Sequence, residues 1–268
     1  MSSIPQADTQ TSSHLTLSHK HPPGPPKWDF FPPYAASPTL NITSRSYPIT
    51  TMTQTVCKVH LVRHAEGVHT LFPDGRTIPD AQLSQRGHDS AEDLGKRLIS
   101  EHSNTICSII SSPLRRTIQT SLAAFHRALH TKYYPTNSGR GVRDGVRLVL
   151  DANLQEIDDL PCNTGSPREE LIDQFPELHD EISLLHPRWY VKSGPESPLP
   201  PPRAQRKEQI LKRLEQAFQE SSGSKKTDVV VVTHGGVIGM LVPGADIDVA
   251  QWKTFNLVRT SSGQLELE

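Results

Sequence analysis

Two segments far apart in the chain each place a histidine beside groups that could hold an anion. His64 follows Arg63 at the end of one run of β-branched residues, and His234 precedes Gly235 and Gly236 at the end of another. Glycine has no side chain, so the backbone there can approach a ligand closely. Open α/β sheets place their chemistry beyond the carboxyl ends of the strands. We therefore expect the two histidines to face one shared site.

A third segment, residues 111–117, follows another apolar run and contains Pro113, Arg115 and Arg116. Pro113 is expected to open a helix whose free backbone N–H groups and positive dipole end point toward the same edge of the sheet. The planar fork of an arginine matches the geometry of phosphate oxygens. Together these groups predict a pocket for a phosphate. Such a pocket needs no metal ion and no cofactor, because the arginines can neutralise charge that develops on the phosphoryl oxygens.

Strand and helix patterns alternate along the part of the chain that carries these segments. Near-continuous apolar runs, typical of buried parallel strands, occupy residues 56–62, 106–110, 147–150 and 229–232. Helical spacing of apolar residues follows Ser84, resumes at Pro113 and extends to Leu129, and covers residues 203–220. This alternation predicts an α/β fold, a three-layer α/β/α sandwich with a mostly parallel central sheet.

Two loop insertions and a terminal hairpin complete the predicted domain. Residues 131–146 and the proline-rich residues 193–202 are expected to be loops. Residues 253–259 and 264–267 are separated by a turn-like segment rich in serine, with one glycine. These two stretches predict a hairpin at an edge of the sheet.

The composition indicates one folded domain preceded by an extension. The 268 residues, 34% hydrophobic and 21% charged, can bury the core of one medium-sized domain. Residues 1–55 hold 9 of the 23 prolines, mixed with serine and threonine, and such a composition cannot sustain a helix, a sheet or a core. We therefore expect a disordered, proline-rich extension over residues 1–55 and a single domain over residues 56–268.

Charge and cysteine content narrow the partners and the compartment. A formal net charge of −1 gives no general attraction for nucleic acid or an anionic membrane. Cys57, Cys107 and Cys162 are widely spaced and lack the C-x-x-C pattern, which favours a reducing compartment and argues against a structural zinc site. No apolar run reaches the roughly 18 residues that span a bilayer. We expect a protein of the cytoplasm, or alternatively the nucleus, whose partner is a small phosphorylated substrate; the sequence does not fix its oligomeric state.

Five motifs together resemble the histidine phosphatase superfamily, specifically its phosphoglycerate mutase-like branch. They are Leu-Val-Arg-His-Ala-Glu-Gly at 61–67, Leu-Ser-x-x-Gly at 83–87, Ser-Ser-Pro-Leu-Arg-Arg-Thr at 111–117, Leu-Gln-Glu at 154–156 and Val-Thr-His-Gly-Gly at 232–236. The resemblance covers residues 56–260 and implies a phosphoglycerate mutase-like fold. Its most specific part is the order of Arg-His, Ser-x-x-x-Arg and His-Gly-Gly along the chain.

The resemblance also implies a role for each matching residue. His64 would be the nucleophile that becomes phosphorylated, and Glu156 would be the proton donor. Three side chains would hold the phosphate: Arg63, Arg116 and His234. These roles describe phosphoryl transfer through a phosphohistidine, in which covalent catalysis splits one difficult displacement into two easier ones.

For two of these roles, other residues of the same chemical type stand in the motifs or close to them. Arg116 is favoured over Arg115 because Ser112 precedes it by four residues and Thr120 follows it by four, which matches the family spacing. Arg115 would then point about 100° away around the helix. For the proton donor, three other acids remain alternatives to Glu156, namely Glu66, Asp158 and Asp159.

Some positions depart from the family pattern. Family members with mutase activity carry Asn where Thr70 stands, and related sequences favour Asp at Asn163 and Gln at Ser90. These differences lie in the expected substrate walls and spare the phosphate pocket. His69 and Thr70 are candidate substrate contacts, with packing of their own loop as the alternative.

A phosphomonoesterase is the favoured function. The loop insertions and the absence of Asn at position 70 suggest that water reaches the phosphohistidine. A phosphoglycerate mutase, which would exclude water until its substrate turns round, is the second hypothesis. A non-catalytic phosphatase-like domain that binds through its proline-rich arm is the third, although a scaffold has no need of such a cluster of positive charges.

Overall fold

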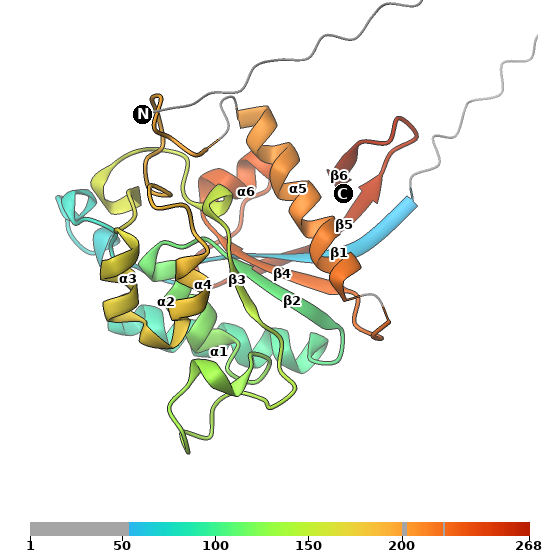
Figure 1. Ribbon diagram of the computed structural model, residues 1–268, viewed down its shortest axis with the longest axis horizontal. Helices are drawn as coiled ribbons and strands as arrows, with labels where there is room; N and C mark the ends of the chain where they lie inside the picture. The colour runs from blue at the N-terminus through green and yellow to red at the C-terminus, as the bar shows by residue number, and fades with distance from the viewer. Residues whose placement is uncertain (1–53, 200–202, 222) are drawn as a thin grey trace, which may run out of the picture. The chain divides into compact units, whose positions relative to one another are not determined.

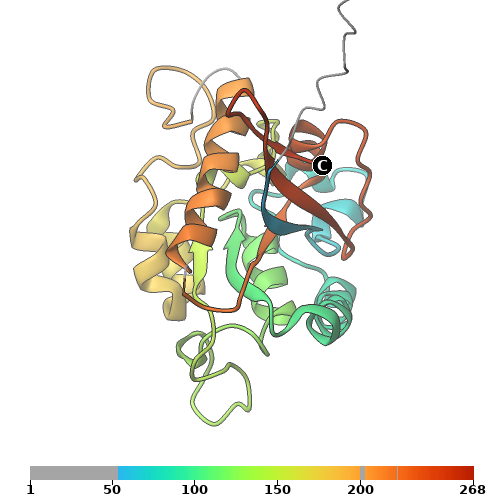
Figure 2. The ribbon, with the colours of Figure 1, turned by 90° about the vertical axis from the view of Figure 1, so that its right-hand side faces the viewer.

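A six-stranded sheet forms the centre of the fold, in the order β3-β2-β4-β1-β5-β6. The strands are β1 (Gln54–Arg63), β2 (Ile106–Ser111), β3 (Leu148–Leu150), β4 (Asp228–Thr233), β5 (Trp252–Arg259) and β6 (Leu265–Leu267). The first four run parallel, and β5 pairs antiparallel with both β1 and β6. The mostly parallel sheet and its edge hairpin, which faces the viewer in Figure 2, are thus confirmed.

The computed structural model describes residues 54–199, 203–221 and 223–268. The expected proline-rich extension over residues 1–55 falls almost entirely outside these residues and stays a prediction. Residues 193–199 of the second expected insertion form a loop, and the other insertion contains little more than one short 3-10 turn.

Helices cover both faces of the sheet, which confirms the three-layer arrangement (Figure 1). They are α1 (Gln85–His102), α2 (Arg115–Ala124), α3 (Arg168–Gln174), α4 (His179–Ser183), α5 (Arg203–Glu220) and α6 (Gly235–Leu241). The first four pack on one face, and α5 and α6 pack on the other. Short 3-10 turns lie between them: η1 (Val68–Thr70), η2 (Gly75–Thr77), η3 (Thr131–Tyr133), η4 (Ala152–Leu154), η5 (Pro161–Asn163) and η6 (Pro176–Leu178).

The helix starts show how local sequence fixes the layers. Ser84 caps α1 as predicted, because its Oγ accepts the Gly87 N–H at 2.9 Å. The helix expected from Pro113 to Leu129 is shorter. It begins at Arg115 and ends at Ala124, and Leu129 instead forms a parallel β-bridge with Val146.

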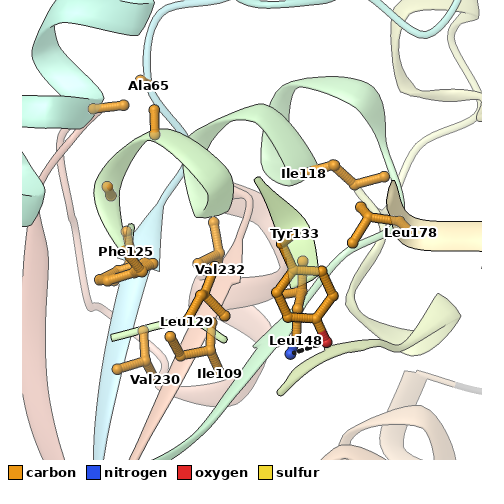
Figure 3. Close-up of a cluster of buried hydrophobic side chains, with 14 of the residues drawn as sticks. Ala65, Ile109, Ile118, Phe125, Leu129, Tyr133, Leu148, Leu178, Val230 and Val232 are labelled. Carbon is orange, nitrogen blue, oxygen red and sulfur yellow. Dashed lines mark hydrogen bonds between the residues drawn. The ribbon is translucent and has the colours of Figure 1, made fainter. Parts of the chain in front are cut away.

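The larger of the two cores contains a buried tyrosine among apolar side chains (Figure 3). The Tyr133 hydroxyl accepts the Leu148 N–H at 3.0 Å and donates to Glu181 Oε1 at 2.8 Å. A buried hydroxyl with no partner would be costly. These two bonds let Tyr133 fill the core while joining the edge strand β3 to α4.

Strand register brings the functional segments to one edge of the sheet. Arg63 at the end of β1 is paired with Thr233 at the end of β4, and Ser111 at the end of β2 is paired with Val232. The chain therefore leaves three neighbouring strands at the same level. Among the described helices, none is long and apolar enough to cross a membrane.

Candidate active site

Three buried side chains meet beyond the carboxyl ends of β1, β2 and β4. His64 follows β1, Arg116 lies in the first turn of α2, and His234 follows β4. His64 is 5% exposed, Arg116 is 1% exposed and His234 is 0% exposed. The two imidazole rings lie 5.0 Å apart between centroids, and Arg116 donates a hydrogen bond to each of them. The structure thus brings together residues that the sequence placed in three separate segments, one of them a helix.

The tautomer of His64 follows from its hydrogen bonds. Its Nδ1 lies 2.7 Å from the carbonyl oxygen of Ala65, which can only accept, so Nδ1 carries the proton. In the neutral ring, Nε2 then holds the lone pair. Arg116 Nε donates to this Nε2 at 3.2 Å, which places a cation beside the atom that would attack phosphorus.

Burial keeps both histidines uncharged at neutral pH. It lowers the pKa of His64 well below the usual value, and the adjacent guanidinium of Arg116 lowers that pKa further. The same two causes hold the pKa of His234 well below its usual value. A neutral His64 has a lone pair on Nε2, as a nucleophile requires.

His234 is oriented from both sides of its ring. Arg116 Nη2 donates to Nδ1 at 3.0 Å, so the proton of the neutral ring lies on Nε2, which donates to Ser112 Oγ at 2.9 Å. Ser112 Oγ also accepts the Leu114 N–H at 3.3 Å. The hydroxyl of Ser112 therefore fixes His234 relative to the end of β2.

The expectation that α2 presents free N–H groups to an anion is wrong for the donors at its start. The Arg115 N–H donates to Asp80 Oδ1 at 3.0 Å, and the Leu114 N–H is bonded to Ser112. Asp80 is 1% exposed and also accepts the Ser166 N–H. The buried Asp80 carboxylate thus occupies a backbone N–H that was expected to bind an anionic ligand. The positive charge of the site therefore comes from side chains.

Cys162 and Asn163 hold Arg116, so the expectation that the difference at Asn163 spares the phosphate pocket is wrong. Arg116 Nη1 donates to the carbonyl oxygen of Cys162 at 2.7 Å, and its Nη2 donates to Asn163 Oδ1 at 2.7 Å. Asn163 in turn donates to Asp158 Oδ1 at 2.6 Å. In the sequence, the only signal at Asn163 is its departure from related sequences, which predicts a place in the substrate walls.

Arg63 supplies a second guanidinium with donors to spare. Its Nη1 donates to the carbonyl oxygen of Ile247 at 3.0 Å. Its Nε is buried, and within the described ranges it has no hydrogen-bond partner. A Cβ atom at Gly235 would lie 3.4 Å from Arg63 Cζ, so glycine leaves room for the guanidinium. A buried N–H without a partner beside this cavity suits an anionic ligand.

Glu156 lies against the backbone that follows His234. Its Oε1 accepts the Ile157 N–H at 2.8 Å, and its Oε2 accepts the Gly236 N–H at 3.4 Å. A Cβ atom at Gly236 would clash with this carboxylate. The second glycine of the His-Gly-Gly motif is therefore needed for the close approach of the acid.

Two cations from distant segments hold the loop that carries Glu156. Lys192 Nζ donates to the carbonyl oxygen of Glu156 at 2.7 Å and also to that of Asp158. Arg206 donates to the carbonyl oxygen of Asn153 at 2.8 Å and to that of Gln155. Burial lowers the pKa of Lys192 to about 8. Nothing in the local sequence signals this role, because the contacts are made to backbone atoms.

The remaining candidates divide into those that face the cavity and those that do not. Among the alternative acids, Asp158 lines the cavity but is bonded to Asn163, while Asp159 is exposed outside the lining. Glu66 accepts the Ser84 hydroxyl at 2.7 Å at the start of α1. Of the four acids, Glu156 remains the one in the lining whose carboxylate has only backbone N–H partners.

His69 and Thr70 both line the cavity, which has a volume of about 470 Å³. Burial, with the nearby Arg116, lowers the pKa of His69 to about 4, so its ring is neutral at pH 7. Thr70 donates its hydroxyl to the carbonyl oxygen of Gly67 at 2.8 Å. Both residues can therefore contact a ligand, although Thr70 also stabilises its own turn.

Arg115 points to the other side of α2. Its Nη2 lies 3.2 Å from Glu170 Oε2 and its Nε lies 3.7 Å from Asp80 Oδ2. It does not line the cavity. This placement separates the two adjacent arginines and leads to a direct test.

Replacing Arg116 with Ala is expected to lower kcat/KM for a phosphate monoester by about 10² to 10³-fold, because it removes donors that act on the phosphoryl group in the transition state. Arg116→Lys should lose nearly as much, since one ammonium cannot replace the guanidinium fork. Arg115→Ala is the matched control and should change kcat/KM by less than about threefold. Equal losses for Arg115→Ala and Arg116→Ala in steady-state assays would contradict the assignment.

One group of side chains in the described part of the chain could hold a metal ion, and it lies away from this cavity. It consists of His60, His102 and Asp228. His60 Nε2 is 3.2 Å from Asp228 Oδ2, and His102 Nδ1 is 3.8 Å from the same oxygen. Asp228 begins β4, whereas His234 follows its end, so this group belongs to the opposite edge of the sheet.

The comparison with protein families agrees with the arrangement of motifs. A sequence model of the histidine phosphatase superfamily (branch 1) matches residues 59–268. The Arabidopsis thaliana phosphoglycerate mutase-like protein 2 is 33% identical over 103 residues, which are 35% of this chain but only 26% of that relative's length. A second Arabidopsis thaliana protein, phosphoglycerate mutase-like protein, is 24% identical over 204 residues, covering 68% of this chain and 72% of the relative. The structure of mycobacterial glucosyl-3-phosphoglycerate phosphatase aligns with a TM-score of 0.48 at 19% identity, over 79% of this chain and 96% of that chain.

Proposed function

Because the chain belongs to the histidine phosphatase superfamily (branch 1), we propose that it is a metal-independent phosphomonoesterase that acts through a phosphohistidine. The family match over residues 59–268 confirms the resemblance carried by the five sequence motifs. The substrate we propose is a small phosphorylated metabolite. Neither a metal ion nor an organic cofactor has a part in the proposed reaction.

One observation carries this proposal: a neutral imidazole nitrogen accepts a hydrogen bond on its lone pair from a buried guanidinium. His64 Nε2 is 3.2 Å from Arg116 Nε, and both residues line the cavity. A nucleophile needs an available lone pair, and a phosphoryl group needs fixed positive charge around its oxygens. The pair supplies both within one hydrogen-bond distance.

In the first step, His64 Nε2 attacks phosphorus in line with the leaving oxygen. The P–N bond forms as the P–O bond to the alcohol breaks, and Glu156 gives its proton to the departing alkoxide. Arg63, Arg116 and His234 stabilise the three remaining phosphoryl oxygens: Arg63 Nε has no hydrogen-bond partner among the described residues, Arg116 Nε turns from His64 to the phosphoryl group, and the Nε2 proton of His234 turns to it from Ser112. His64 Nδ1 keeps its proton and its hydrogen bond to the carbonyl oxygen of Ala65. That oxygen stabilises the positive charge of the phosphohistidine ring.

In the second step, water attacks the phosphohistidine. The ionised Glu156 takes a proton from the water, an O–P bond forms and the P–N bond breaks. Inorganic phosphate leaves, and His64 returns to the neutral state with its lone pair on Nε2. The same cationic groups serve both steps, because the charge on the phosphoryl oxygens is similar in each.

Phosphate release is expected to exceed isomerisation when the enzyme is given 3-phosphoglycerate or another monoester in the presence of a chelator. The mutase alternative needs a site that keeps water away from the phosphohistidine, whereas this cavity opens at a rim of exposed loop residues. Free phosphate and 2-phosphoglycerate are to be measured in the same reaction. Efficient isomerisation with little free phosphate would reject the hydrolase and leave the phosphohistidine in place.

The cellular setting we propose is the cytoplasm, with the nucleus as the alternative. The three cysteines are free thiols, as is usual in a reducing compartment. The net charge of −1 gives no general affinity for nucleic acid or anionic lipid. A small phosphorylated molecule is therefore the partner that the protein's charges favour.

A further inference from the structure

Exposed apolar side chains gather at the mouth of the catalytic cavity. In the part of the chain that the structure describes, six large hydrophobic residues are exposed: Leu71, Phe72, Val142, Leu160, Leu184 and Val249. Three of the six, Phe72, Leu160 and Val249, line the cavity that contains His64, and they are 58%, 37% and 39% exposed. Scattered exposed hydrophobic residues need no explanation, but a group of them around one pocket indicates a binding surface.

The three residues come from separate loops. Phe72 lies between η1 and η2, Leu160 precedes η5, and Val249 lies between α6 and β5. None of the three belongs to either hydrophobic core. Their convergence is therefore a product of the fold, and packing of the interior does not account for it.

Two of these loops are attached to the catalytic residues. The Ala250 N–H donates to the carbonyl oxygen of His64 at 3.3 Å, and Ala250 has a φ of 54°, a conformation that non-glycine residues rarely adopt. This contact fixes Val249 relative to the nucleophile. The Leu160 N–H donates to Asp158 Oδ1 at 3.2 Å, and the same oxygen accepts a hydrogen bond from Asn163. Val249 and Leu160 thus keep a defined distance from the phosphate-binding groups.

We propose that the alcohol part of the substrate carries an apolar group, an alkyl chain or an aromatic ring, which packs against Phe72, Leu160 and Val249 while the phosphate binds at His64. This inference rests on the proposed phosphomonoesterase function. Arg76, an exposed cation of the same lining, would instead favour an alcohol with a second anionic group, such as a carboxylate. The two kinds of substrate are separated by the experiment below.

A series of straight-chain monophosphates from methyl to hexyl phosphate tests the apolar group alone, because the leaving alcohols have nearly the same acidity. Each buried methylene should raise kcat/KM by about threefold to fourfold until the apolar surface is covered. Propyl phosphate should also exceed glycerol phosphate and 3-phosphoglycerate, which have the same number of carbon atoms. A flat series, or a preference for the carboxylate-bearing ester, would overturn the proposal.

Substitutions at the mouth of the cavity test whether these apolar residues cause the preference for longer alkyl chains. Phe72→Ser and Leu160→Ser should each lower the ratio of kcat/KM for hexyl phosphate to that for methyl phosphate by about tenfold. Leu184→Ser is the matched control, because Leu184 is 87% exposed but lies outside the cavity lining, and it should leave the ratio unchanged. An unchanged ratio in both rim variants would also overturn the proposal.

The outcomes distinguish this inference from the function on which it rests. Hydrolysis of p-nitrophenyl phosphate together with a flat alkyl series would reject the apolar group and keep the phosphomonoesterase. Failure to hydrolyse any monoester would reject both.

Discussion

Replacing His64 with Ala is expected to lower turnover of an aryl phosphate by about 10⁴-fold or more, because the variant has no group that can form the covalent intermediate. His64 is the imidazole whose lone pair lies against Arg116 Nε in the cavity. The variant should also lose a phosphoprotein adduct that is labile in acid and stable in base. The measurements are steady-state rates and the label retained after quenching with a phosphorus-32 substrate.

His69 provides the matched control for this experiment. Its ring lies 6.1 Å from that of His64 between centroids, it lines the same cavity, and it is neutral at pH 7 because burial lowers its pKa to about 4. It is not bonded to Arg116, so His69→Ala should keep the adduct. If His64→Ala retained the label and His69→Ala lost it, His69 would be the nucleophile.

Glu156→Gln should slow alkyl phosphates by about 10² to 10⁴-fold and activated aryl phosphates far less, because only a poor leaving group needs a proton as its bond to phosphorus breaks. The amide keeps one oxygen, which can accept the Ile157 N–H as Oε1 does at 2.8 Å, and loses only the acceptor of the 3.4 Å bond from the Gly236 N–H. Lys192 still holds the loop through the carbonyl oxygens of Glu156 and Asp158, so the loop should stay in place. The measurement is kcat/KM across esters whose alcohols span a wide range of pKa values.

Asp158→Asn serves as the control for a second carboxylate in the cavity lining. Asp158 holds Asn163, which binds Arg116, so this change should slow all esters to a similar degree. Equal losses for both ester classes in Glu156→Gln would mean that Glu156 positions the substrate without protonating it. A leaving-group dependence found only in Asp158→Asn would make Asp158 the acid.

The parts of this fold that could be predicted from sequence are those fixed by nearby residues. The Ser84 cap depends on a contact three residues away, and the buried strand that precedes His64 shows as a run of apolar residues. The meeting of His64 and His234 was predictable because parallel strands end at one edge of the sheet. In each case a local pattern or a general rule of topology was sufficient.

The parts that could not be predicted depend on contacts between distant segments. Asp80 takes the N–H of Arg115, 35 residues away, and so removes a donor that the isolated helix would have offered to an anion. Asn163 reaches Arg116 only because the turn after Glu156 folds back over α2. A single sequence does not show which distant residues meet: the residue type at Asn163 sets it apart, but nothing in the sequence pairs it with Arg116.

The attachment of the Glu156 loop through carbonyl oxygens bears on how this enzyme could evolve. Lys192 and Arg206 bind backbone atoms that every amino acid possesses, so the exposed side chains of that loop, Asp159 and Leu160, can be exchanged while the attachment persists. Selection can therefore alter what the loop presents to an alcohol without moving the carboxylate of Glu156. An ancestral scaffold built in this way can give rise to descendants with different substrates and the same chemical steps.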